Sequence, residues 1–200
     1  MEKIISEEQS DNLMRLPGEV TSVSLKNDLD FVLREEGEEG LKRLEKAMAN
    51  EGFPIKHKEL KSGKVYPFRM AIALIIVIQR LFNYDNDKLR EMGRVEARIS
   101  SFLIRVFMRH FISLERVAKE VPTMWKEHYN VGQPRVMELN KEKKYVVLRI
   151  EDFHSHPFIC QVHQGYFPAM VEMVVGTKVS CQETKCIFRG DPYHEFLLKW

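Results

Sequence analysis

The chain has 200 residues, of which 44% are hydrophobic and 30% charged, and its formal net charge is +2. A chain of this length buries a sizeable core without external staples, and so small a charge gives no reason to expect a surface for nucleic acid or an anionic membrane. Its three cysteines, an odd number, argue against a disulfide framework and favour a reducing, cytoplasmic setting.

The first half of the chain is predicted to be helical. Residues 1–15 are polar and acidic, unlike a secretory or transit signal, and we expect a loosely held helical tail ahead of a single domain over residues 16–200. After a short extended entry, helices are expected from Ser24 to about Arg34, from Glu38 to Gly52 and from about Pro67 to Asn83. The longest apolar run, MAIALIIVI, is far shorter than the roughly 20 residues that a helix needs to cross a bilayer, so we expect a soluble protein.

Two further helices are predicted in the middle of the chain, from Asn86 to Phe111 and from Leu114 to Tyr129, the second interrupted near Pro122. Arginines form a stripe on the first, which we interpret as a solvated face. Aromatic side chains at helical spacing usually pack in a core, and His110 on an apolar face is usually a core histidine, but such groups also suit a ligand pocket, and His110 a haem axial position. The candidate lining residues are Phe102, Phe107, His110, Trp125 and Tyr129.

After Gly132 the hydrophobic pattern changes from helical to alternating. The segments RVMEL and YVVLRIEDF, separated by the polar turn NKEKK, predict two antiparallel strands. Pro157 is expected to open a helix that Gly176 closes, and a hairpin with the turn RGDP ends the chain. Helices followed by strand–strand–helix–strand–strand predict an α+β fold, with a helical layer packed on an antiparallel sheet.

All three cysteines and two of the seven histidines lie between Cys160 and Phe196. Cys186 and His194 are symmetric about Gly190, and residues opposed in a hairpin have Cβ atoms roughly 4.5–5.5 Å apart. Cys160 falls on the apolar face of the preceding helix, which is expected to point toward the sheet. Thiolate, imidazole and carboxylate all bind zinc, so we predict a metal site formed by Cys160, Glu183, Cys186 and His194.

This set meets a geometric difficulty, because Glu183 and Cys186 are three residues apart and would point to opposite faces of a regular strand. Both can bind one ion only if the strand is bulged or begins after Glu183. Cys181 has the parity of Glu183 and is an alternative ligand, whereas its spacing from Cys186 disfavours a local disulfide.

Other interpretations of the polar residues stay open. Free cysteines are often small buried hydrophobes. A second histidine-rich group can form near Pro157, although its members also suit a helix N-cap and a polar loop: Asp152, His154, His156 and His163.

The pattern E-x-x-C-x-x-x-G-x-x-x-H-x-F, from Glu183 to Phe196, resembles the ending of the 4-vinyl reductase domain family, which usually reads E-x-x-C, a glycine turn and C-x-F. In members that are aromatic-sensing input domains of bacterial transcription activators, zinc is bound by Cys, Glu, Cys and Cys. The resemblance therefore implies zinc at the four residues named above, with His194 in place of the last cysteine. It is best over residues 133–200 and extends to a superfamily that includes haem–nitric-oxide-binding domains and trafficking-complex subunits.

The function that this resemblance implies is a non-catalytic sensory domain for a small hydrophobic ligand held between the helical layer and the sheet, with a structural zinc site. A homodimer and a separate output protein are the expected partners. The alternatives are a haem-based gas sensor, a protein-interaction module of the same fold and an enzyme acting on a tetrapyrrole. The sequence contains no phosphate-binding glycine loop, nucleophile elbow or zinc-protease motif, so no motif in it indicates a catalytic activity.

Overall fold

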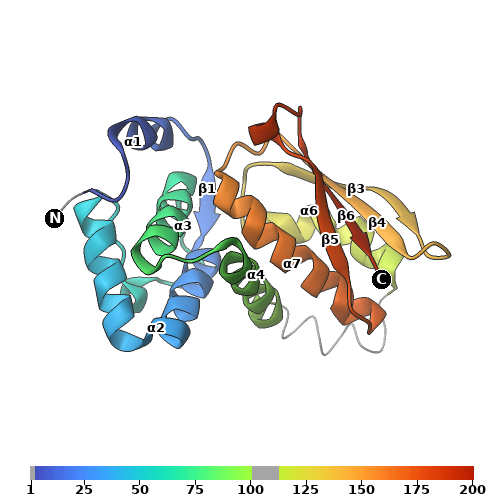
Figure 1. Ribbon diagram of the computed structural model, residues 1–200, viewed down its shortest axis with the longest axis horizontal. Coiled ribbons are helices and arrows are strands. Elements are labelled where there is room, and N and C mark those ends of the chain that lie inside the picture. The colour runs from blue at the N-terminus through green and yellow to red at the C-terminus, as the bar shows by residue number, and fades with distance from the viewer. Residues whose placement is uncertain (1–2, 101–112) are drawn as a thin grey trace.

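The computed structural model describes residues 3–100 and 113–200 (Figure 1). Phe102, Phe107 and His110 lie outside this range. The N-terminal half consists of helices and a short two-stranded ribbon, in which β1 (Glu19–Thr21) pairs with β2 (Val65–Pro67). Its helices, in chain order, are α1 (Glu7–Met14), α2 (Ser22–Asn50), the short 3-10 turn η1 (His57–Glu59), α3 (Phe68–Phe82) and α4 (Asn86–Ser100).

Helix α2 combines the two helices that the sequence predicts. The backbone leaves helical geometry at Gly37, which has φ of 70° and ψ of −174°. A residue with a β-carbon rarely adopts this positive φ, so glycine produces the kink between the two halves. Helix α3 follows β2 in the chain and is the predicted buried helix, because its residues from Ala71 to Ile78 are all buried.

The N-terminal segment is packed against the core and is not loosely held as expected. Ser6 and Gln9 form a capping box that begins α1, and the side chains of Ile5 and Leu13 are 1% and 4% exposed. The backbone N–H of Ile4 donates to Glu51 Oε1 at 2.7 Å. Two buried side chains and a hydrogen bond to α2's C-terminal cap therefore hold a segment whose polar composition suggested a tail.

The C-terminal half begins with α6 (Leu114–Lys126), in which Pro122 lies inside the helix, and continues into an antiparallel sheet. The strands are β3 (Gln133–Asn140), β4 (Tyr145–Glu151), β5 (Ser180–Lys185) and β6 (His194–Lys199). Their order in the sheet is β3-β4-β6-β5, so two hairpins meet where β4 pairs with β6. The predicted α+β fold and both predicted hairpins are confirmed.

Helix α7 (Pro157–Val175) crosses the buried face of the sheet and separates it from the N-terminal helices (Figure 1). It begins at Pro157 and ends at Gly176, whose φ is 72°, as the sequence predicts. Alternate residues of β4 and β6 face it, and these include Leu148, Ile150 and Phe196. Among the described residues, no helix is long and apolar enough to cross a bilayer.

Two glycines let α4 and α7 approach until their backbones touch. A β-carbon built on Gly165 would lie 1.8 Å from the carbonyl oxygen of Arg90, and one on Gly93 would lie 2.0 Å from that of Val162. Real β-carbons do not approach backbone atoms so closely, so neither position accepts a side chain without movement of a helix.

We therefore predict that Gly165→Ala destabilises the protein. At an open helical site the same change stabilises by about 0.5–1 kcal/mol, but overpacking here should cost about 1–3 kcal/mol or more. Chemical denaturation of the two proteins measures the difference in free energy of unfolding. An unchanged or increased stability would show that the two helices do not depend on this contact.

Candidate functional site

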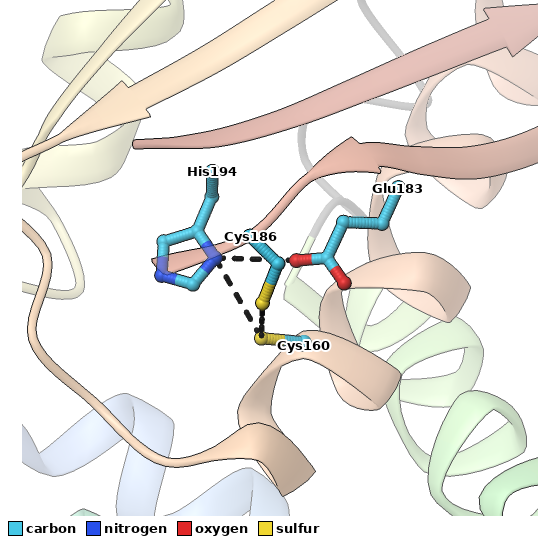
Figure 2. Close-up of side chains that lie close together, drawn as sticks. All are labelled: Cys160, Glu183, Cys186 and His194. Carbon is cyan, nitrogen blue, oxygen red and sulfur yellow. Dashed lines mark hydrogen bonds and ion pairs between the residues drawn. The ribbon is translucent and has the colours of Figure 1, made fainter. Parts of the chain in front are cut away.

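Four potential metal ligands meet where α7 begins and where the loop joins β5 to β6 (Figure 2). Cys160 lies in the first turn of α7, Glu183 in β5, Cys186 immediately after β5 and His194 at the start of β6. One donor atom from each lies within 4.8 Å of the others. The side chains of His194 and Glu183 are 2% and 6% exposed, and both cysteines are buried. The four residues predicted from the sequence therefore form one buried cluster.

The distances within the cluster fit a tetrahedral cation. Zinc bonds of about 2.3 Å to sulfur and about 2.0–2.1 Å to nitrogen or oxygen place two sulfurs about 3.8 Å apart, sulfur and nitrogen about 3.6 Å apart, and nitrogen and oxygen about 3.4 Å apart. The Sγ atoms of Cys160 and Cys186 are 3.9 Å apart, and Cys160 Sγ lies 3.7 Å from His194 Nδ1. His194 Nδ1 is 3.2 Å from Glu183 Oε1. The cluster can therefore hold a metal ion with little movement.

A bulge in β5 turns both Glu183 and Cys186 inward. Glu183 pairs with Phe196 and Lys185 with Glu195, so β5 contributes one more residue than β6 at this point. The extra residue is Thr184, whose hydroxyl donates to the carbonyl oxygen of Glu195 at 3.2 Å. The strand is thus bulged, which is one of the two arrangements that the sequence requires for a site with these ligands.

Neighbouring groups fix the orientation of the ligands. His194 Nε2 lies 3.2 Å from the carbonyl oxygen of Phe153, which assigns a proton to Nε2 and directs Nδ1 at the other three ligands. The backbone N–H of Cys186 donates to Asp191 Oδ2 at 2.8 Å, which holds the turn after β5. Arg189 donates to the carbonyl oxygen of Glu183 at 3.1 Å. These contacts assemble the cluster from the chain alone.

Burial controls the protonation of the cluster. It raises the pKa of the Cys160 and Cys186 thiols, and the nearby Glu183 carboxylate raises both further. Burial also raises the pKa of Glu183, but hydrogen bonds from His194, Cys186 and Cys160 outweigh it and hold that pKa below its usual value. The thiols therefore stay protonated unless a cation compensates the thiolates, and a bound metal would release their protons.

An apolar cavity of about 110 Å³ lies between α6, α7 and the sheet. Its walls come from α6 (including Val117 and Val121), from α7 (including Phe167 and Met170) and from β3, β4 and β6. This is the position at which the sequence predicts a ligand pocket. The same helix that supplies Cys160 thus also supplies one wall of the cavity.

A second, smaller cavity of about 50 Å³ lies between α7 and the N-terminal helices. It shares four lining residues with the apolar cavity: Trp125, His128, Tyr166 and Phe167. The rest of its wall is more polar and includes Ser24 and Asp28 of α2, Glu96 of α4 and His163 of α7. The two cavities therefore lie on either side of one group of ring side chains.

Of the five predicted ligand-lining residues, Trp125 and Tyr129 lie in the described part of the chain. Trp125 lines both cavities and Tyr129 the polar one, and their rings pack at 4.9 Å between centroids. Trp125 Nε1 donates to the carbonyl oxygen of Val131 at 2.7 Å. Ligand binding by these residues remains a prediction.

The second histidine-rich group does not assemble. His156 is the N-cap of α7, and its Nδ1 accepts from the backbone N–H of Phe158. His163 lies in an aromatic cluster, with ring centroids 4.9 Å from Phe167 and 5.7 Å from Phe153. Within the described ranges, the donor atoms that converge are those of the four-residue cluster around Cys160.

The polar cavity is not predicted by any pattern in the sequence. Asp28 and Glu96 come from different helices, and their carboxyl groups hydrogen-bond each other. Ser24 Oγ lies 2.9 Å from His128 Nδ1, and the two are far apart in the chain. No spacing rule connects such residues, although acidic residues on otherwise apolar helix faces are a weak signal of a buried polar site.

Comparison with known proteins yields a fold but no family. No family model matches the chain, and no curated protein matches it. An H-NOX protein from S. oneidensis in the Fe(II)NO ligation state has a TM-score of 0.65 and 14% identity over 90% of this chain and 98% of that one. An unliganded Fe(II) H-NOX mutant from K. algicida has a TM-score of 0.65 and 12% identity over 90% of this chain and 95% of that one.

The phenol-responsive sensory domain of the transcription activator PoxR, with phenol, is a more distant match. It has a TM-score of 0.49 and 17% identity over 64% of this chain and 73% of that chain. The two H-NOX matches show that this chain has the H-NOX fold, and at these identities they show the fold alone.

The environment of His163 generates a prediction about stability and pH. Burial lowers the pKa of His163 to about 3, whereas an unfolded histidine titrates near 6.5. Between these values the unfolded chain binds a proton that the folded chain does not. The stability that neutral His163 contributes is therefore complete above about pH 6.5 and declines as the pH falls.

We predict that the wild type loses about 2 kcal/mol of stability relative to His163→Phe between pH 7 and pH 5. Urea denaturation at the two pH values measures this difference. His154→Phe is the control, because His154 is exposed and its replacement should leave the pH dependence unchanged. Parallel pH profiles for the wild type and His163→Phe would refute the assignment.

Proposed function

We propose that this chain is a small-molecule-binding sensory domain that takes a hydrophobic ligand and is braced by a structural zinc ion. The observation that carries the proposal is the apolar cavity between α6, α7 and the sheet. Similar structures support it, because H-NOX proteins of this fold include one described with Fe(II) and NO bound. The ending of the chain supports membership of the 4-vinyl reductase domain family, which we retain as part of the proposal.

The size of the cavity limits the ligand. At about 110 Å³ it is comparable with the roughly 150 Å³ apolar cavity that binds benzene in an engineered protein. Its walls are almost entirely hydrocarbon, so burial of apolar surface drives binding. The ligand class we propose is a single aromatic ring or a short aliphatic chain.

Helix α7 connects the ligand to the metal cluster. Tyr166, Phe167 and Met170 line the cavity, and Cys160 in the same helix belongs to the cluster. A ligand signals only if it binds two arrangements of the protein with different affinity. We propose that the alternative arrangements differ in the position of α7 over the sheet, and that a separate partner protein distinguishes them.

Zinc is the metal that the donor set favours. Two thiolates, one imidazole and one carboxylate are all zinc ligands, and four protein ligands make a closed structural site. The ion would connect the start of α7 to the loop end of the β5–β6 hairpin. The residues that would hold it are the four that already converge (Figure 2), and its contribution would be stability.

We retain the predicted homodimer and the predicted alternatives with their tests. Sedimentation of the purified protein distinguishes a monomer from a dimer. A haem sensor, with His110 or a histidine of the 154–163 group as axial ligand, would show iron and a Soret band. An interaction module would form a stable complex without binding a small ligand.

The zinc assignment predicts about one zinc per chain in protein purified without chelator. Cys186→Ala should lose the metal and, if free zinc exceeds the dissociation constant a thousandfold, about 4 kcal/mol of stability. Cys181→Ala is the matched control, because Cys181 is also free but lies outside the cluster. Elemental analysis and thermal denaturation measure both effects. A wild-type protein without metal, or one with iron, would contradict the zinc assignment.

The cavity assignment predicts that toluene or phenol binds the wild type and quenches or shifts the fluorescence of Trp125, which lines the cavity. Val121→Phe should fill the space and weaken binding about tenfold or more, a loss of at least 1.4 kcal/mol. Val65→Phe is the control, since Val65 is 54% exposed in β2. Equal affinity in the wild type and Val121→Phe would place the ligand elsewhere.

A further inference from the structure

The polar cavity contains a pair of carboxyl groups that share a hydrogen bond. Asp28 lies on α2 and Glu96 on α4, and both line the cavity. Burial raises the pKa of Asp28 to about 7, and burial together with the neighbouring Asp28 raises that of Glu96. Two carboxylates in contact away from water repel each other, so the pair keeps a proton for its shared hydrogen bond. A ligand that brings positive charge would stabilise the ionised pair in place of that proton.

One acceptor in this cavity has no partner. Glu96 Oε1 is buried and makes no hydrogen bond. An unsatisfied buried acceptor costs about 1–3 kcal/mol, and native proteins contain few of them. A ligand that donates a hydrogen bond to Oε1 would remove this cost.

The remaining lining residues fit a cation. No lysine or arginine is among the described residues that line the cavity. Its two histidines are predominantly neutral at pH 7, because burial lowers the pKa of His163 to about 3 and also lowers that of His128. The rings of Trp125, Tyr129 and Tyr166 face the same space, and aromatic faces attract cations, including ammonium groups.

A metal ion is a poorer match for this cavity. Among the described residues, the cluster around Cys160 is the group of three or more side chains whose donors converge on one point. The pair of Asp28 and Glu96 supplies two carboxyl groups, but no third histidine, cysteine or acidic side chain of the described residues lies close enough. A cavity of about 50 Å³ with two acids and aromatic walls suits a single ammonium group.

We propose that this polar cavity binds the ammonium group of a small amine whose apolar part lies toward the adjoining apolar cavity. The four lining residues common to the two cavities connect the two halves of such a ligand. The proposal rests on the proposed function, since it specifies the class of ligand that the sensory domain takes. Glu96 and Asp28 are then the residues that select an amine over a neutral molecule of the same shape.

The test compares two ligands of almost equal shape, 2-phenylethylamine and 2-phenylethanol, by calorimetric titration of the wild-type protein at pH 7. The amine should bind at least about tenfold more tightly, because a buried, hydrogen-bonded charge pair is worth well over 1.4 kcal/mol. In Glu96→Gln, which preserves shape but not charge, the preference should fall below about threefold. Asp28→Asn is a second variant with the same expectation, and thermal denaturation shows that each variant is folded.

Glu91→Gln is the matched control, because Glu91 lies on the same helix α4 with its side chain 47% exposed. It should preserve the amine preference. Equal binding of amine and alcohol would overturn the proposed ammonium site. This result is also expected if a cationic side chain from another part of the chain already pairs with the two carboxyl groups, and in that case too the site does not bind an ammonium group. If Val121→Phe then abolished binding of both, the sensory function would stand without this selectivity. If neither ligand bound, and toluene and phenol also failed, the proposed function itself would fail.

Discussion

The backbone contact between α4 and α7 is the constraint on which the rest of the structure depends. Gly93 and Gly165 allow the two helices to touch, and this contact sets the position of α7 between the N-terminal helices and the sheet. One end of α7 then brings Cys160 to the hairpin, while its middle lines both cavities. A shift of α7 would change the cluster around Cys160 and both cavities together, so the geometry of all three features depends on the position of this helix.

Local chemistry made much of this molecule predictable. Pro157 and Gly176 mark the ends of α7, and the alternating pattern after Gly132 identifies both hairpins. Three of the four cluster residues lie in that final hairpin, where the spacing of residues in the sequence determines the distance between them. Metal binding is one of the few roles that thiols and imidazoles share. The four side chains converge as the sequence predicts because these constraints are short in range, and metal binding by them stays a prediction.

The features that sequence did not reveal depend on long-range contacts. Asp28 and Glu96 meet only because α2 and α4 pack together. The burial of Ile5 depends on packing and a contact with Glu51 rather than on the polar composition of its neighbours. The buried acids and His163 also lower stability compared with an apolar core, which is a common feature of sites that retain polar groups for binding.

The bulge at Thr184 has a consequence for association between chains. Among the described strands the order is β3-β4-β6-β5, so β5 is an edge strand of the sheet. A regular edge strand offers unpaired N–H and C=O groups to another chain. The bulge interrupts that row and bends the edge. The irregularity that directs Glu183 and Cys186 to the same side thus also makes this edge a poorer template for a further strand.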